Sequence, residues 1–230
     1  MSEPETDSSL DITTLLASSI HDIKNSLNLL LAEVDLVSDF LDMDDTVQSR
    51  TLMNLKATTK RLNNELTQLL VLYRLKTGTY QVNPVFINIG DFIEERYEEQ
   101  KTFLEMNNIE LKVDCSAEMY WNIDPMLVTI AINNAINNAR RYARGQVILS
   151  AHEQDKMLCI QIQDNGEGFP DKLLKNTGIN TIEPGSGNTG VGLYFCNEIA
   201  KGHRRQERSG RLQLDNTGPD GGASISLLLP

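Results

Sequence analysis

Apolar residues recur at alternating spacings of four and three along the first part of the chain. The members of this series are Leu16, Ile20, Ile23, Leu27, Leu30, Val34, Val37 and Leu41. A heptad of this kind is typical of a helix that packs along one side against other helices. Ser8 or Ser9 can cap its start, and the turn-forming stretch 41–46 interrupts the pattern. The pattern predicts one long helix that ends near residue 41.

A second heptad series follows and stops near Gly78. Its members are Leu52, Leu55, Thr59, Leu62, Leu66, Leu69 and Tyr73. Two consecutive helices predict an antiparallel hairpin, which alone has too little opposing surface to cover both apolar stripes. We therefore expect pairing with a second copy into a four-helix bundle, that is, a homodimer through residues 10–77. Residues 1–9 are then a disordered N-terminus and residues 78–84 a linker.

The pattern changes after residue 84 to short apolar or alternating runs separated by amphipathic segments. Strands are predicted near residues 85–89, 109–113, 146–151 and 157–163, with a closing pair at 212–216 and 223–229. Helices are predicted over residues 90–106, 125–142 and 190–201. The stretch 176–189 is rich in Gly, Asn, Thr and Pro, which indicates a mobile loop. Residues 85–230 should therefore form a mixed α/β domain.

The net charge and the cysteines indicate which kinds of partner and which cellular compartment to expect. The net charge of −11 and the pI of about 4.7 argue against nucleic acid or an anionic membrane surface as the main partner. The three cysteines, Cys115, Cys159 and Cys196, are widely separated and predict free thiols in a reducing compartment. The sequence shows neither a signal peptide nor a run of about 18 apolar residues. We expect a soluble, cytoplasmic protein without a membrane span.

A histidine, an acid and an amide share the outer face of the first predicted helix. If Ile20 and Ile23 face the seam, then His21, Asp22 and Asn25 lie outside it. A neutral imidazole can attack a phosphoryl group, with a neighbouring carboxylate such as Asp22 acting as base. On this helix alone, an ordinary solvated face is the better interpretation. Motifs in the second predicted domain make a phosphoryl-accepting histidine the better one.

Two asparagines lie on one face of the helix predicted over residues 125–142. Asn134 and Asn138 are four residues apart, and Arg141 and Tyr142 follow one turn later. Carboxamide oxygens on one face suit a hard cation and its phosphates. Ordinary solvated amides are the alternative, which fits less well because asparagine is a poor helix former.

Two glycine-containing motifs follow. Asp164 comes directly after an apolar strand, together with Gly166 and Gly168, so that a carboxylate can accept a hydrogen bond from an exocyclic amine while the backbone approaches a flat ring. A second motif places four glycines before an apolar helical run, where backbone amides can bind phosphate: Gly185, Gly187, Gly190 and Gly192. Each motif alone is a weak signal. The order amide helix, acid–glycine turn and glycine-rich helix start is a strong one.

With these motifs in this order, the chain resembles the sensor histidine kinases from about residue 10 to residue 230. HDIKNSL resembles their phosphoacceptor box, and NNAINNARRYA, DNGEGFP and GSGNTGVGL resemble the N, G1 and G2 boxes of an ATP-binding fold shared with gyrase, mismatch-repair and chaperone ATPases. The resemblance implies an α+β architecture, in which a dimerising hairpin that forms a four-helix bundle precedes an α/β sandwich that binds ATP.

The resemblance also implies roles for individual residues. His21 would be phosphorylated from Mg-ATP and pass the phosphoryl group to an aspartate of a response regulator receiver domain. Asp22 and Asn25 could also serve a phosphatase reaction on that receiver. The remaining positions would bind the nucleotide: Asn138 and Asn134 through Mg2+, Asp164 with Gly166 and Gly168 at the adenine, Arg141 and Tyr142 at the phosphates and ring, and Gly187, Gly190, Gly192 and Leu193 over the triphosphate. Residues 176–189 would be the ATP lid.

Other functions stay open at this point. A degenerate kinase-like module that binds ATP or a receiver, or a phosphatase-only protein, is favoured by Ser26, where the family usually has proline, and by the lack of phenylalanine between Phe169 and Phe195. A protein serine kinase of the anti-sigma type shares the ATP fold but lacks the hairpin. About ten residues precede the first predicted helix, so we expect the signal to come from a separate sensory partner or from sequence of a longer product. The run KGHRRQERSGR reads as a solvated face or loop.

Overall fold

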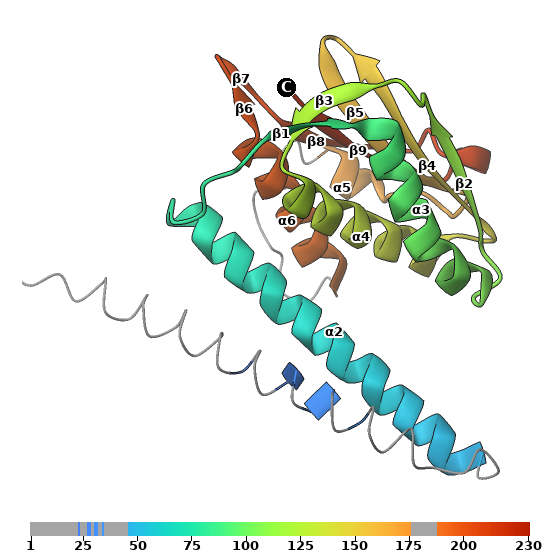
Figure 1. Ribbon diagram of the computed structural model, residues 1–230. Helices are drawn as coiled ribbons and strands as arrows, with labels where there is room; N and C mark the ends of the chain where they lie inside the picture. Colours follow the sequence, from blue (N-terminus) through green and yellow to red (C-terminus); the bar gives the residue numbers. More distant parts are fainter. Residues whose placement is uncertain (1–22, 24–26, 29, 32–33, 35–45, 176–187) are drawn as a thin grey trace, which may run out of the picture. The chain divides into compact units, whose positions relative to one another are not determined.

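The computed structural model describes residues 23, 27–28, 30–31, 34, 46–175 and 188–230. The chain divides into two compact units, residues 1–79 and residues 80–230. The first unit contains the long helix α2 (Thr46–Lys76), and the described residues before it are also helical (Figure 1). Within the described part of the chain, no helix combines the length and apolar character that crossing a bilayer requires.

In each heptad series of the first unit, some of the described members are buried within the chain and others are exposed. Thr59 and Val34 are buried, and Leu27 and Leu66 are half-buried. The Asn63 amide donates to Asn28 Oδ1 over 2.9 Å, which joins α2 to the helical residues before it. The members that lie between these positions in the heptads remain exposed: Ile23, Leu30, Leu55, Leu62 and Leu69.

The second unit is built around a five-stranded mixed sheet of order β2-β4-β5-β9-β8 (Figure 1). The strands are β2 (Glu110–Cys115), β4 (Gln146–Gln154), β5 (Met157–Asp164), β9 (Ser224–Leu229) and β8 (Arg211–Asp215). Only the β2–β4 pair among these is parallel. Two antiparallel ribbons lie outside the sheet, β1 (Val85–Asn88) with β3 (Tyr120–Ile123), and β6 (Arg204–Arg205) with β7 (Arg208–Ser209).

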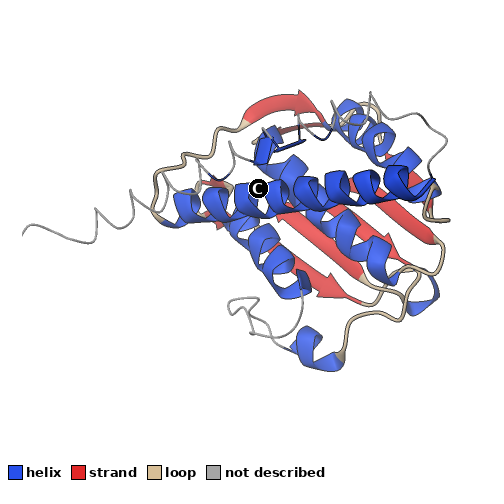
Figure 2. Cartoon of the chain, turned by 90° about the horizontal axis from the view of Figure 1, so that it is seen from below, coloured by secondary structure: helices blue, strands red, loops and turns tan. Residues whose placement is uncertain are grey.

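Helices cover one face of this sheet (Figure 2). They are α3 (Ile89–Glu105), α4 (Pro125–Tyr142) and α6 (Asn188–Gly202), while α5 (Asp171–Lys175) and the short 3-10 turn η1 (Pro219–Gly221) lie in connections. The fully buried side chains between helices and sheet include Ile132, Leu149, Ile160, Phe195 and Ile199. Each large apolar side chain buried in this way contributes about 1.5–3 kcal/mol. This layer of helices on a sheet confirms the predicted α+β sandwich.

The predicted elements of the second unit are confirmed, with small shifts at their ends. α3 begins at Ile89 rather than at residue 90, because the Asn88 side chain accepts hydrogen bonds from Gly90 N and Asp91 N and so caps the helix. α6 begins at Asn188 rather than at residue 190. Strand β3 was not predicted, since its four residues show no run long enough to mark a strand. The three cysteines are free, as predicted.

A buried polar cluster holds the start of α4. Asp124 caps this helix through Leu127 N and also accepts hydrogen bonds from Tyr80 Oη at 3.1 Å and Asn83 N at 3.0 Å. Burial and then the neighbouring Asp124 charge raise the pKa of Tyr80 to about 12. The backbone N–H of Asp124 donates to His203 Nε2 at 3.0 Å, so the other ring nitrogen, Nδ1, carries the proton of the neutral ring. The cluster thereby ties the segment after α2 to α4.

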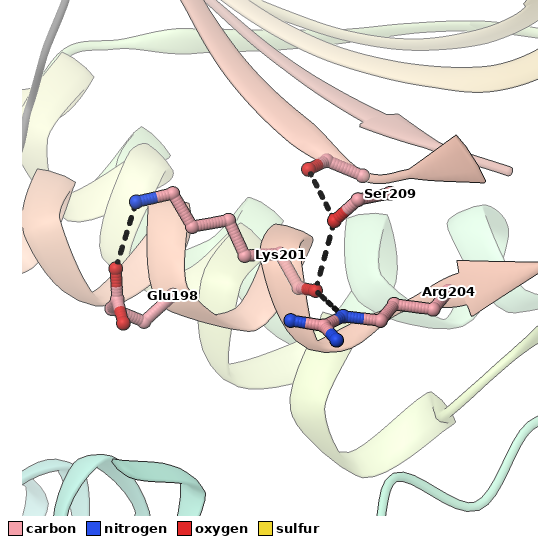
Figure 3. Close-up of polar contacts among 5 residues, drawn as sticks. Glu198, Lys201, Arg204 and Ser209 are labelled. Carbon is pink, nitrogen blue, oxygen red and sulfur yellow. Dashed lines mark hydrogen bonds and ion pairs between the residues drawn. The ribbon is translucent and has the colours of Figure 1, made fainter. Parts of the chain in front are cut away.

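The run KGHRRQERSGR is not a simple solvated loop, which corrects part of the expectation. Its arginines are exposed, but residues 204–209 pair as the ribbon β6–β7, and His203 is only 2% exposed. His203 Nδ1 lies 2.9 Å from the Ile199 carbonyl. The Lys201 carbonyl at the end of α6 accepts hydrogen bonds from Ser209 Oγ and Arg204 Nε (Figure 3). The ribbon therefore closes the end of α6, whose last carbonyls lack partners within the helix.

The buried ring of His203 makes the stability of the second unit depend on pH. Burial lowers the pKa of His203 below 6.5, although the Ile199 carbonyl and the Asp124 charge oppose this shift. Because the folded-state pKa is the lower one, the unfolded chain takes up the proton first, and stability that is complete above pH 6.5 is lost as the pH falls below it. In His203→Gln, thermal melts between about pH 7.5 and about pH 5.5 should show a smaller loss of melting temperature than in wild type.

The matched control for this variant is His152→Gln, since His152 is an exposed histidine on β4. It should retain the pH dependence of the wild type. Equal slopes of melting temperature against pH in wild type and His203→Gln would contradict the assignment.

Candidate functional site

Asp164 is a buried carboxylate at the end of β5. Its residue is 2% exposed, and Oδ1 accepts hydrogen bonds from Gly166 N at 2.8 Å and Ala223 N at 3.4 Å. Burial raises the pKa of Asp164, and the two backbone hydrogen bonds oppose that rise. A carboxylate held by backbone donors at a strand end is a fixed acceptor for a further donor, such as an exocyclic amine.

The acid–glycine turn lies against the end of α4. A Cβ added at Gly166 would come within 2.4 Å of the Tyr142 carbonyl oxygen and 2.8 Å of Asp164 Oδ1, so only glycine fits between them. Arg141 and Tyr142 are both exposed at this end of the helix. The structure thus brings Asp164, Gly166 and Tyr142 together.

Asn138 lies one helical turn before Tyr142 and is buried, with 8% of the residue exposed. Neither Nδ2 nor Oδ1 of its carboxamide has a hydrogen-bond partner among the described residues. A buried polar group left in this way costs about 1–3 kcal/mol. Such a cost is tolerated where the group serves a ligand, so the Asn138 carboxamide is the strongest structural mark of a binding site in the second unit.

Asn134 faces the start of α6. Its Nδ2 donates to the Ile130 carbonyl at 2.9 Å, and its Oδ1 lies 3.5 Å from the position that a Cβ on Gly192 would take. Leu193, the next residue, has its side chain buried in the core at 3% exposure, so it has a packing role as well as its predicted place beside the triphosphate. Gly190 lies in the first turn of α6. The structure therefore brings Asn134 and the glycine-rich helix start together.

Several predicted positions lie outside the described residues. They are His21, Asp22, Asn25, Ser26, Gly187 and most of the predicted lid.

Two positioning residues were missed by the sequence analysis. Asn165 Oδ1 accepts the N–H groups of three consecutive residues, 144–146, at 3.0–3.1 Å, which fixes the connection from α4 to β4 beside the acid–glycine turn. An asparagine directly after a strand-end acid is a local signal for such a turn. Asn216, on the connection from β8 to β9, is paired with the backbone of Phe169, and it carries no local signal at all.

The three parts of the site fit an adenine nucleotide with Mg2+. Asp164 offers a buried acceptor to the amine of the base. The unpartnered Asn138 offers a hard oxygen ligand, which suits Mg2+. The first turn of the 15-residue helix α6 presents backbone N–H groups and the positive end of a helix dipole, which suit phosphate.

Residues 123–230 match the family described as "Histidine kinase-, DNA gyrase B-, and HSP90-like ATPase". The chain is 25% identical over 177 residues to the signal transduction histidine-protein kinase AfsQ2 of Streptomyces coelicolor, covering 75% of this chain. It is 23% identical over 227 residues to the sensor protein kinase WalK of Staphylococcus haemolyticus, covering 94% of this chain. The chain spans about a third of the length of these relatives, 31% and 36% respectively.

A solved structure is similar to the chain over most of its length. The crystal structure of full-length ShkA in complex with AMPPNP superposes on 94% of this chain and 45% of its own chain, with a TM-score of 0.72. The sequence identity is 17%, so this likeness concerns the fold.

Replacement of Asn138 by leucine should separate stability from binding. The apolar side chain removes the unpartnered buried amide, so the free energy of unfolding should rise by about 1 kcal/mol. Mg-ATP should no longer raise the melting temperature, because the proposed oxygen ligand is gone. Thermal melts with and without Mg-ATP measure both effects.

Asn137→Leu is the matched control, since Asn137 is the exposed neighbour on the same helix. It should keep the wild-type response to Mg-ATP. A full Mg-ATP shift in Asn138→Leu would remove Asn138 from the site.

Proposed function

We propose that the chain is the catalytic core of a sensor histidine kinase. Residues 123–230 match the histidine kinase, gyrase and HSP90 family of ATPases, and the relatives above are named as kinases. The second unit binds Mg-ATP, and its γ-phosphoryl group is transferred to His21. The observation that carries this proposal is the buried carboxamide of Asn138, which has no hydrogen-bond partner among the described residues. It lies one helical turn before Tyr142, and the acid–glycine turn packs against the Tyr142 carbonyl.

Within the second unit each residue has a distinct task. Asp164, in its ionised form, accepts the hydrogen bond of the adenine amine, with Gly166 and Gly168 allowing the ring to approach. Asn138 and Asn134 hold Mg2+, which supplies neutralisation of the phosphate charge. Arg141 and Tyr142 flank the phosphates and ring from the exposed end of α4. Gly187, Gly190 and Gly192, with Leu193 behind them, contribute backbone N–H groups to the triphosphate under a lid of residues 176–189.

The chemical step is attack by a neutral imidazole nitrogen of His21 on the γ-phosphorus. An N–P bond forms, the bond to the β–γ bridging oxygen breaks, and ADP leaves with that electron pair. Asp22 accepts the proton from the other ring nitrogen as positive charge develops on the ring. Catalysis then depends mainly on positioning and on charge neutralisation. We assign these roles from the sequence pattern of the first helix.

The phosphoryl group is then passed to an aspartate of a response regulator receiver domain. In a phosphatase reaction on the same receiver, Asp22 and Asn25 serve to remove the phosphate, and Asn25 positions the attacking water. We propose that the signal reaches these two units from a sensory module, on a separate partner or on a further part of a longer product.

The exposed half of the heptad seam supports homodimerisation through residues 10–77. On α2, Leu55, Leu62 and Leu69 recur every seven residues and are 42–48% exposed, so they form one apolar stripe two helical turns apart. Ile23 and Leu30 add the same spacing on the preceding helix, at 49% and 39% exposure. Heptad leucines left uncovered within one chain are covered when a second hairpin packs against them as a four-helix bundle.

Replacement of His21 by glutamine should abolish labelling of the protein from radioactive ATP, because no other side chain is proposed to accept the phosphoryl group. Label on the wild type should be acid-labile and alkali-stable, as expected of phosphohistidine, and should require Mg2+. Autoradiography after acid and alkali treatment measures this.

His152→Gln is the matched control, an exposed histidine in the ATP-binding unit that should leave labelling unchanged. Persistent label on His21→Gln would refute the phosphoacceptor assignment. Wild-type protein that binds Mg-ATP and never becomes labelled would instead indicate a binding module or a dedicated phosphatase.

Replacement of Leu62 by glutamate should split the dimer, since it places a charge in the centre of the exposed stripe. Light scattering coupled to size exclusion should report a mass that falls from twice 25.8 kDa to 25.8 kDa. Asn64→Glu adds the same charge at an exposed polar position of α2 and should remain dimeric. A dimer that survives in Leu62→Glu would contradict the proposed interface.

A further inference from the structure

The connection between β8 and β9, residues 216–223, wraps around the acid–glycine turn. The N–H of Asp164 donates to the Ala223 carbonyl at 2.9 Å, and the Ala223 N–H returns a hydrogen bond to Asp164 Oδ1. A Cβ added at Gly222 would come within 2.0 Å of the Asp164 carbonyl oxygen, so the two backbones touch. The Gln163 amide adds a hydrogen bond to the Thr217 carbonyl at 3.2 Å. The connection thus fixes the Asp164 end of the turn.

Asn216 fixes the other end. Its Oδ1 accepts the N–H of Phe169 at 2.7 Å, and its Nδ2 donates to the carbonyl of the same residue at 3.0 Å. This two-point pairing joins residues 47 positions apart. A Cβ on Gly168, which has a φ of 77°, would lie 2.7 Å from Asn216 Cγ, so the side chain is also packed against the turn. The neighbouring Asp215 accepts the N–H of Thr217 and so fixes the backbone on which Asn216 stands.

We infer that Asn216 is a positioning residue for recognition of the adenine base. The inference rests on the proposed function, since it deepens the assignment of Asp164. The turn from Asp164 to Phe169 contains two glycines, which give it more conformational freedom than other residues would. With both ends held, the Asp164 carboxylate is already ordered when the base arrives. Binding then avoids the entropy cost of ordering the turn.

The action of Asn216 is confined to the base. Both hydrogen bonds of its carboxamide are with Phe169, and the carboxamide also lies against Gly168, so within the described part of the chain these contacts are with the acid–glycine turn. Removal of this side chain should therefore weaken contacts with adenine and leave contacts with the phosphates in place. A merely structural role would affect every ligand alike, or only the melting temperature.

The test is Asn216→Ala in the full chain, titrated by calorimetry with Mg-ATP, Mg-GTP and inorganic tripolyphosphate. We expect the Kd for ATP to rise about tenfold, since two hydrogen bonds that order the turn are lost. The Kd for tripolyphosphate should stay within about twofold, and the preference for ATP over GTP should fall about tenfold. Asn107→Ala is the matched control, because it removes another asparagine-to-backbone hydrogen bond, to Phe103 at the end of α3.

Asn216→Asp provides a second variant if the alanine protein does not fold. It keeps the oxygen that accepts from Phe169 N–H and loses the donor to the carbonyl, so its loss of ATP preference should be intermediate. An unchanged ATP preference in a folded variant, or an equal loss of affinity for all three ligands, would overturn the role of Asn216. Wild-type protein without any preference for ATP over GTP would instead overturn the proposed role of Asp164 and this inference with it.

Discussion

The burial of one carboxylate, Asp164, at the end of β5 sets the arrangement around the site. An ionised carboxylate out of water must be surrounded by donors, and here they are backbone N–H groups from Gly166 on one side and Ala223 on the other. The first donor requires a tight turn pressed against the end of α4, which only glycine allows. The second donor requires the β8–β9 connection to return to the end of β5. The candidate site is therefore assembled by the same contacts that stabilise this buried acid.

Local periodicity was sufficient to predict most elements, because helices and strands bury one face at a fixed spacing. α4 and the central strands β4 and β5 follow directly from that rule. The pairings that shape the site do not follow from it. Asn216 finds its partner 47 residues away, and His203 meets the Asp124 backbone 79 residues away. Such contacts depend on which strands become neighbours in the sheet, and no spacing along the chain encodes that.

The hairpin shows a second limit of local pattern. Its heptads predict an apolar seam, but a period of seven cannot say which half of the seam is covered within the chain. The structure separates the halves. Val34 and Thr59 are buried, whereas Leu55 and Leu62, one heptad apart, are more than two-fifths exposed. The same repeat thus supplies two surfaces, one that is covered within the chain and one that stays exposed and that we propose for dimerisation.

Some polar groups buried in the second unit have hydrogen-bond partners, and others have none within the described part of the chain. The first kind stabilises the fold, and the second kind indicates a place where a ligand can bind. Asp124 and His203 satisfy one another and their neighbours, so their burial stabilises the fold and leaves nothing to bind. Asn138 is also buried, yet neither Nδ2 nor Oδ1 of its carboxamide has a hydrogen-bond partner among the described residues. Folding stability alone would favour an apolar side chain there. A ligand that supplied the missing partner would return the free energy that Asn138 costs the unliganded fold, which is why this carboxamide supports the proposed site.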